Sequence, residues 1–139
     1  PPFTWADDDL SSLEGSLSKF ANQQRSLRVT LDGFNAFAPR VIYIDVVKSP
    51  EILSLQADLM THLETSLGIV DEVGKQRPFA PHLTVAFRDL TRQNFQAAWR
   101  EFENRQLYFE FTADQLTLLI HDGRRWNIKS EFAFLPSHS

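Results

Sequence analysis

The sequence predicts an α+β fold with mainly antiparallel sheets, and three observations lead to that prediction. Apolar residues recur at helical spacing in three stretches only, while most of the remaining chain has the patterns of β-strands. The connections between successive strands are short, as in hairpins, and helices are too few to serve as parallel crossovers. The chain has 139 residues, of which 42% are hydrophobic and 23% charged, enough for one domain with a buried core.

The first half of the chain is predicted to form one helix and two strands. Residues 7–22 form the helix, because three consecutive aspartates suit the positive end of its dipole and an apolar stripe follows them. Residues 26–31 alternate apolar and polar side chains, and residues 40–47 are rich in β-branched side chains, so both are predicted strands. Residues 33–39, with the sequence GFNAFAP, are predicted to form the turn between them.

The second half is predicted to contain two helices and four strands. The helices cover residues 49–67 and 91–105, and each begins at a residue suited to capping, Ser49 and Thr91. A loop over residues 68–80 separates the first helix from the next strand. The four strands cover residues 82–88, 107–112, 115–121 and 124–135, the last two joined by a hairpin turn at Asp122-Gly123.

A weak internal repeat relates the two halves. Residues 82–121 run strand, helix, strand, strand, and residues 7–47 have the same order without its opening strand. Two such units predict two pseudo-symmetric ferredoxin-like lobes, joined by the helix over residues 49–67 and its loop. Lobe 1 would cover about residues 1–48, incomplete at its N-terminus, and lobe 2 about residues 49–139.

The segment HLTVAFR, residues 82–88, is the candidate for chemistry. Along a strand, alternate side chains share a face, so His82, Thr84 and Arg88 are expected on one face and the apolar residues against helices on the other. Histidine can give or take a proton near neutral pH, a hydroxyl can bind a phosphate oxygen, and Arg88 could add positive charge. Phosphodiester cleavage by acid–base catalysis needs two proton-transfer groups, whereas this strand supplies one.

PHLTVAF resembles the second signature of the 2H phosphoesterases, a family that includes bacterial RNA 2′,5′-ligases and 2′,3′-cyclic nucleotide phosphodiesterases. The family signature is His-x-Thr/Ser followed by an apolar residue. It occurs twice, once on a strand of each of two pseudo-symmetric lobes that flank a central cleft. His82, Thr84 and Val85 match it. LRVTLDGFNAFAPRVIYIDV resembles the central strand pair of the family, with Phe37 in the usual place, and PPFTW resembles the segment after the first signature.

The resemblance implies a phosphoesterase that needs no metal or other cofactor and acts on a 2′,3′-cyclic phosphate or a 2′,5′ linkage. The substrate would be an RNA end or a small nucleotide. His82 would be the general acid or the general base, and the sequence does not distinguish the two roles. Thr84 would hold a non-bridging phosphate oxygen, and the strand would place both side chains toward the cleft.

The sequence departs from the family in having no second His-x-Thr/Ser. None of the other three histidines, His62, His121 and His138, is followed two residues later by Thr or Ser. His82 lies nine residues before the cap at Thr91, and the same spacing before the first helix places the matching histidine about two residues before Pro1. We therefore expect a native chain that continues upstream with a His-x-Thr/Ser strand whose imidazole faces His82, and little or no activity without it.

The remaining polar residues are interpreted as structural. His62 lies beside the apolar stripe of its helix, and His121 borders a hairpin turn, although it is the first alternative for a second proton carrier. Three basic residues near that turn suggest a solvated hairpin tip, with a phosphate or RNA contact as the alternative: Arg124, Arg125 and Lys129. Two further basic residues, Lys75 and Arg77, precede the candidate strand and could overhang the cleft.

Composition and the absence of known motifs exclude several classes of function. The net charge of −4 gives no general attraction to long nucleic acid, and the absence of cysteine excludes disulfides and thiolate chemistry and fits a cytoplasmic protein. No apolar run is long enough to span a membrane, and no metalloprotease, P-loop or Rossmann motif is present. We expect a monomer. The alternatives are a non-catalytic nucleotide- or RNA-end-binding protein of the same fold and a structural domain without a ligand.

Overall fold

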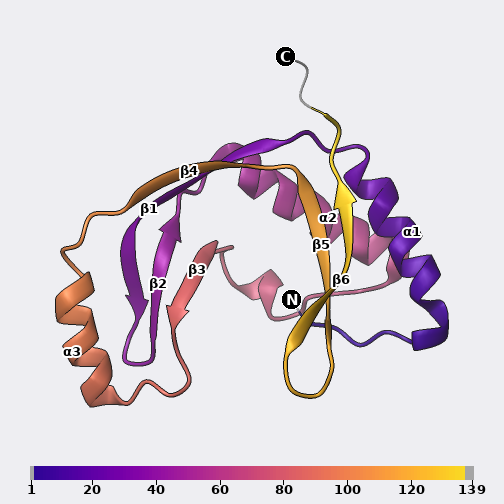
Figure 1. The fold of residues 1–139 in the computed structure, drawn as a ribbon. Coiled ribbons are helices and arrows are strands. Elements are labelled where there is room, and N and C mark those ends of the chain that lie inside the picture. Colours follow the sequence, from indigo (N-terminus) through magenta and orange to yellow (C-terminus); the bar gives the residue numbers. More distant parts are fainter. Residues whose placement is uncertain (1, 137–139) are drawn as a thin grey trace. The chain divides into compact units, whose positions relative to one another are not determined.

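The structure is a computed structural model that describes residues 2–136, and it confirms the predicted α+β class. A short 3₁₀ turn precedes the first helix, and another, Gly74–Gln76, lies in the long loop before β3 (Figure 1). The helices are α1 (Leu10–Ala21), α2 (Pro50–Leu67) and α3 (Arg92–Phe102). The strands are β1 (Leu27–Phe37), β2 (Val41–Val46), β3 (His82–Ala86), β4 (Tyr108–Ala113), β5 (Gln115–His121) and β6 (Trp126–Ala133).

The described chain divides into two compact units. The first unit contains residues 2–27, 50–79 and 112–136, and the second contains residues 28–49 and 80–111. The expected division into lobes of residues 1–48 and 49–139 stays a prediction, and each of the two compact units draws on both ranges. Each unit is therefore assembled from segments that are far apart in the sequence.

The second unit is built on a four-stranded sheet in the order β3-β2-β1-β4. Both β1–β2 and β2–β3 are antiparallel pairs. On one face, Ile42 and Ile44 are 1% and 8% exposed, and α3 packs against β2 there. The rings of Phe34 and Phe102 lie 5.1 Å apart, and Phe95 on α3 is also buried. This apolar face fixes the register of the sheet, because a shift by one residue would expose the isoleucines.

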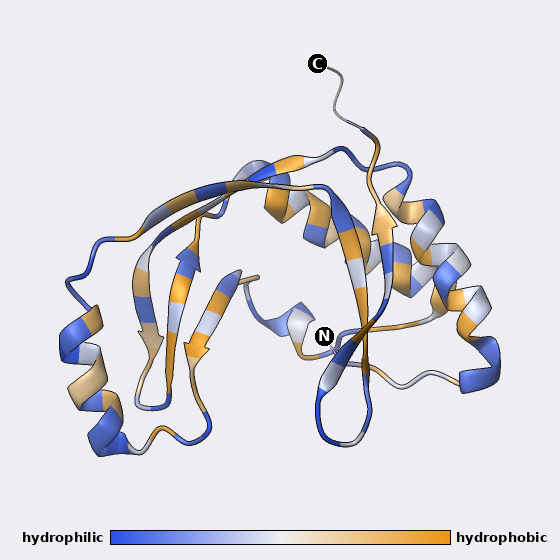
Figure 2. Ribbon diagram, in the orientation of Figure 1, coloured by the Kyte–Doolittle hydropathy of each residue, from blue (hydrophilic) through white to orange (hydrophobic). Residues whose placement is uncertain are grey.

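The first unit packs α1 and α2 with the antiparallel β5–β6 hairpin. Its buried core consists of Leu13 and Leu17 from α1 and Leu63 from α2, members of the apolar stripes expected from the sequence. Apolar residues of β5 and β6 pack around this core, whereas the hairpin tip is hydrophilic (Figure 2). Within residues 2–136, no helix has the length and apolarity to cross a membrane.

The prediction of a turn over residues 33–39 is wrong for residues 33–37, which belong to β1. β1 continues to Phe37, and the register with β2 shifts between Leu31 and Phe34. Gly33 has a φ of 78°, a left-handed conformation that glycine adopts without steric cost, so the strand bulges there instead of ending. Glycine signals both a turn and a bulge, which is why the pattern alone indicated a turn.

The expectation that Leu83, Val85 and Phe87 pack against helices is also wrong. Their exposed fractions are 50%, 50% and 51%. The physical reason is the position of β3, which is an edge strand of the sheet, whereas α3 packs against β2. Alternation along the strand is preserved, but the side opposite His82 and Thr84 stays largely uncovered by the described chain.

Candidate functional site

β2 and β3 bring the histidine and the threonine of the candidate motif to one face of the second unit. In the antiparallel pair, His82 lies opposite Asp45 and Thr84 lies opposite Tyr43. Directly opposed residues project from the same face of a sheet, so these four side chains form one surface, opposite the face that holds Ile44. Both His82 and Thr84 are exposed. The register therefore brings the expected imidazole and hydroxyl together, and a cleft in front of them stays a prediction.

A backbone hydrogen bond sets the tautomer of His82. Its Nδ1 lies 2.6 Å from the carbonyl oxygen of Ala80, an atom that can only accept, so Nδ1–H is the donor. Nε2 of the neutral ring then carries the lone pair, and it makes no hydrogen bond to the described residues. Such an imidazole can take a proton through Nε2, or deliver one from that atom when it is charged.

Two aromatic rings support the imidazole on this face. The ring centroids of Phe37 and Tyr43 lie 5.3 and 5.2 Å from that of His82, and 4.5 Å from each other. Tyr43 is only 7% exposed, whereas Phe37 is 45% exposed. Burial, and secondarily the charge of Asp45, raises the pKa of the Tyr43 phenol, so this group stays protonated at physiological pH. Tyr43 therefore acts as a neutral, packed support.

Sequence reasoning missed Asp45 and Asn35 on the same surface. Asp45 lies opposite His82, and its carboxylate accepts a hydrogen bond of 3.2 Å from the Asn35 amide. The Asn35 carbonyl oxygen in turn accepts from the backbone N–H of Ala36 at 2.8 Å. One signal was available in the β-branched run VIYIDVV. Asp45 lies two residues after Tyr43, so both side chains share one face of the strand, and that face is therefore polar.

The strand register that was expected to place Arg88 beside His82 and Thr84 does not extend to it, and its role in the site stays a prediction. β3 ends at Ala86, so strand alternation no longer fixes which way residue 88 points. Arg88 has a φ of 58°, and its guanidinium lies over the ring of the neighbouring Phe87, 5.1 Å from the centroid. The structure therefore separates Arg88 from the strand register that it was expected to share with His82 and Thr84.

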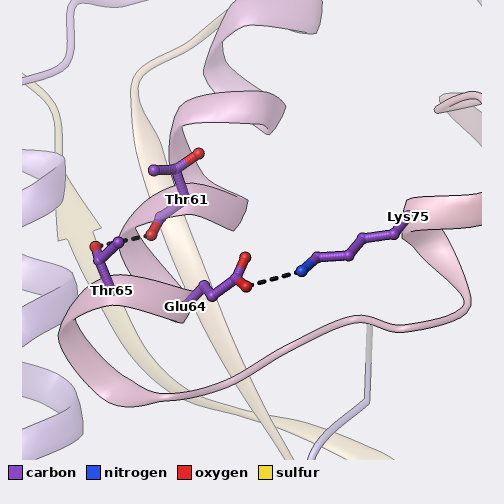
Figure 3. Close-up of polar contacts among 4 residues, drawn as sticks. All are labelled: Thr61, Glu64, Thr65 and Lys75. Carbon is purple, nitrogen blue, oxygen red and sulfur yellow. Dashed lines mark hydrogen bonds and ion pairs between the residues drawn. The ribbon is translucent and has the colours of Figure 1, made fainter.

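Two of the other basic residues are engaged in ion pairs within the first unit. Lys75 lies 2.7 Å from a carboxylate oxygen of Glu64 on α2 (Figure 3). This hydrogen bond is the main cause of the raised pKa of Lys75. Lys129 pairs with Glu14 at 3.1 Å, and the pKa of that carboxyl is lowered chiefly by the same contact. Both ammonium groups are therefore engaged by carboxylates of their own unit.

The other described histidines have structural surroundings, as expected. The His62 ring lies 5.2 Å from that of Phe20, and its Nε2 is 3.1 Å from the Ser16 carbonyl oxygen. The Nδ1 atom of His121 accepts a hydrogen bond of 3.1 Å from the backbone N–H of Gly123 and so supports the hairpin turn. His138 lies outside the described residues.

An apolar groove of about 650 Å³ lies within the first unit. Its floor consists of residues from α1 and α2, among them Leu13, Leu59 and Leu63, and residues 116–121 of β5 border it. Consecutive strand residues point to opposite faces, so the groove reaches the edge of β5. In the described part of the chain, β5 pairs only with β6, which leaves that edge without a strand partner.

The α+β fold and the shared sheet face of His82 and Thr84 agree with the resemblance to the 2H phosphoesterases. The model of the 2′-5′ RNA ligase superfamily matches residues 1–125, so the chain belongs to that superfamily. A Bacillus mycoides (strain KBAB4) protein named "Putative phosphoesterase" is 25% identical over 134 residues, which are 94% of this chain and 73% of that protein.

A solved structure confirms the likeness of the fold. The crystal structure of TT0787 of Thermus thermophilus matches with a TM-score of 0.66 and 20% sequence identity. The match covers 97% of this chain and 75% of TT0787.

Proposed function

We propose that the protein is a phosphoesterase of RNA ends or small nucleotides, acting on a 2′,3′-cyclic phosphate or a 2′,5′-phosphodiester without a metal. The observation that carries the proposal is the shared surface of His82 and Thr84, with Nε2 of the imidazole left available by the bond from Nδ1–H to Ala80. Membership of the 2′-5′ RNA ligase superfamily supports the substrate class. The protein would work as a cytoplasmic monomer.

In this proposal, the hydroxyl of Thr84 donates a hydrogen bond to a non-bridging phosphate oxygen. Neutral His82 accepts the proton of the attacking hydroxyl or water on Nε2. Alternatively, the charged ring donates its own Nε2 proton to the leaving oxygen. In either direction of the reaction, a single histidine can serve as the general base or as the general acid, but not as both at once. The Ala80 carbonyl oxygen keeps the ring in the orientation in which Nε2, and not Nδ1, faces the substrate.

The other proton role needs a second group, which we propose lies on a further His-x-Thr/Ser strand that pairs with β5. The groove of the first unit supports this placement, because it borders an edge of β5 that lacks a partner in residues 2–136. A strand that paired with β5 would satisfy its open backbone groups and cover apolar side chains of α1 and α2. The 139 residues alone should then bind substrate but turn it over at a small fraction of the full rate.

The test is turnover of adenosine 2′,3′-cyclic phosphate and of a 2′,5′-linked dinucleotide by the natural full-length protein in excess EDTA. Hydrolysis or ligation that persists in the chelator supports the proposal. Saturable binding without turnover would favour the non-catalytic binding protein, and neither binding nor turnover would favour a structural domain. Full activity of the 139 residues alone would contradict the placement of the second group, and His121 would then be the residue to replace.

A further inference from the structure

We propose that Phe37 stacks against the base of the substrate and that the site selects nucleotides by the size of the base, purines over pyrimidines. This inference rests on the proposed function and concerns the same surface. It assigns to Phe37 a contact with the ligand that neither the motif nor the family match assigns.

The position of Phe37 carries the first part of the argument. Phe37 and Asn35 share a face of β1, and Asn35 lies opposite Tyr43, so the phenyl ring projects from the surface that holds His82 and Thr84. Its centroid is 5.3 Å from that of the His82 ring. The ribose of one nucleotide separates the base from the 2′,3′-phosphate, so with a phosphate at Nε2 of His82 the base of the same nucleotide can reach Phe37.

The surroundings of the ring carry the second part. Tyr43 lies 4.5 Å away with 36° between the two planes, and the imidazole meets the phenyl ring edge-on at 89°. Two of its sides are thus held by neighbours, yet Phe37 is still 45% exposed. An aromatic ring that is fixed in place and open on one side is a stacking platform, because it loses little conformational freedom when a base covers it.

The polar residues near Phe37 explain why the site should select the size of the base and not its identity. Reading the edge of a base requires donors and acceptors that are free to turn toward it. On this surface, the Asn35 side chain already donates to Asp45 and accepts from the Ala36 N–H. Stacking then dominates recognition, and a purine presents more surface to a phenyl ring than a pyrimidine does.

Isothermal titration of the 139-residue chain with adenosine 2′-monophosphate, cytidine 2′-monophosphate and ribose 5-phosphate tests the inference. Wild-type protein should bind the adenine nucleotide most tightly and the ribose phosphate most weakly. Phe37→Leu keeps an apolar side chain but removes the stacking face, and should weaken binding of the adenine nucleotide about tenfold. It should leave binding of ribose 5-phosphate unchanged, and Phe37→Tyr should bind all three probes as wild type does.

Phe109→Leu is the matched control, because Phe109 is 58% exposed and lies on β4 of the same unit. It should change none of the three affinities. An equal loss for all three ligands in Phe37→Leu would overturn the inference, because Phe37 would then act only by supporting His82. Equal wild-type affinity for the three ligands, together with turnover of adenosine 2′,3′-cyclic phosphate by the full-length protein, would overturn it while the proposed function stands. No binding in this titration and no turnover by the full-length protein would reject both.

Discussion

One backbone carbonyl, that of Ala80, determines what His82 can do, because it accepts a hydrogen bond from Nδ1–H and leaves Nε2 for the substrate. The motif identified His82 and Thr84 from the sequence, since alternation along one strand is a local property. It could not identify Phe37, Tyr43 and Asp45 as their neighbours. Those contacts depend on the register between β1, β2 and β3, which two irregularities shift. Alternation does not determine the side on which Arg88 lies, because the strand ends two residues before it.

Thr84→Val tests the role of the hydroxyl at the scale of a single residue. Valine keeps the shape of the side chain but cannot donate to a phosphate oxygen, and a hydrogen bond to a charged group contributes about 1.5–3 kcal/mol. In the full-length protein, kcat/KM should fall at least tenfold, and Thr84→Ser should restore most of it. Because Thr84 is exposed, thermal unfolding should change little. Wild-type kcat/KM in Thr84→Val would remove the hydroxyl from the mechanism.

At the scale of elements, the sequence predicted every α-helix and strand of the described chain but not the 3₁₀ turn Gly74–Gln76, and the other errors lie where tertiary packing decides. The hydroxyl of Thr91 accepts from the Asn94 N–H at 3.1 Å and caps α3, a local contact that the sequence could indicate. The bulge at Gly33 and the uncovered side of β3 depend on which strands and helices become neighbours. No local pattern carries that information.

The β5–β6 hairpin should respond to acid through Asp122. Its carboxylate accepts hydrogen bonds from the backbone N–H groups of Arg125 and Arg124 and from Asn127, which lower its pKa from 3.8 to about 2. A depressed pKa means that this stabilisation is complete above pH 3.8 and is lost as the pH falls through about 2.

An NMR titration of the Asp122 carboxyl carbon should show this midpoint, and the amide signals of Arg124 and Arg125 should shift with it. In Asp122→Asn, those amide shifts should not follow such a titration. A midpoint at the ordinary value of 3.8 would show that the turn does not hold the carboxylate as the structure indicates.

At the scale of the whole molecule, composition and element order were enough to predict the α+β class but not how the chain is shared between the units. The first unit collects three separate segments and the second collects two. Such sharing depends on contacts between residues far apart in the sequence, such as the bond between the Leu135 N–H and the Gln24 carbonyl oxygen. The weak repeat indicated two units, and packing decided which segments each contains.

The central claim is that His82 transfers a proton in a phosphoesterase reaction, and replacing it tests that claim most directly. The measurement is the turnover of adenosine 2′,3′-cyclic phosphate by the natural full-length protein and by its His82→Ala and His121→Ala variants, in EDTA, with thermal unfolding recorded for each. His82→Ala should lower kcat by about a hundredfold or more, as loss of a general acid or base does, with little change in stability because His82 is exposed. His121→Ala should retain wild-type turnover. Wild-type turnover in His82→Ala would contradict the account, and so would a loss of activity explained by unfolding.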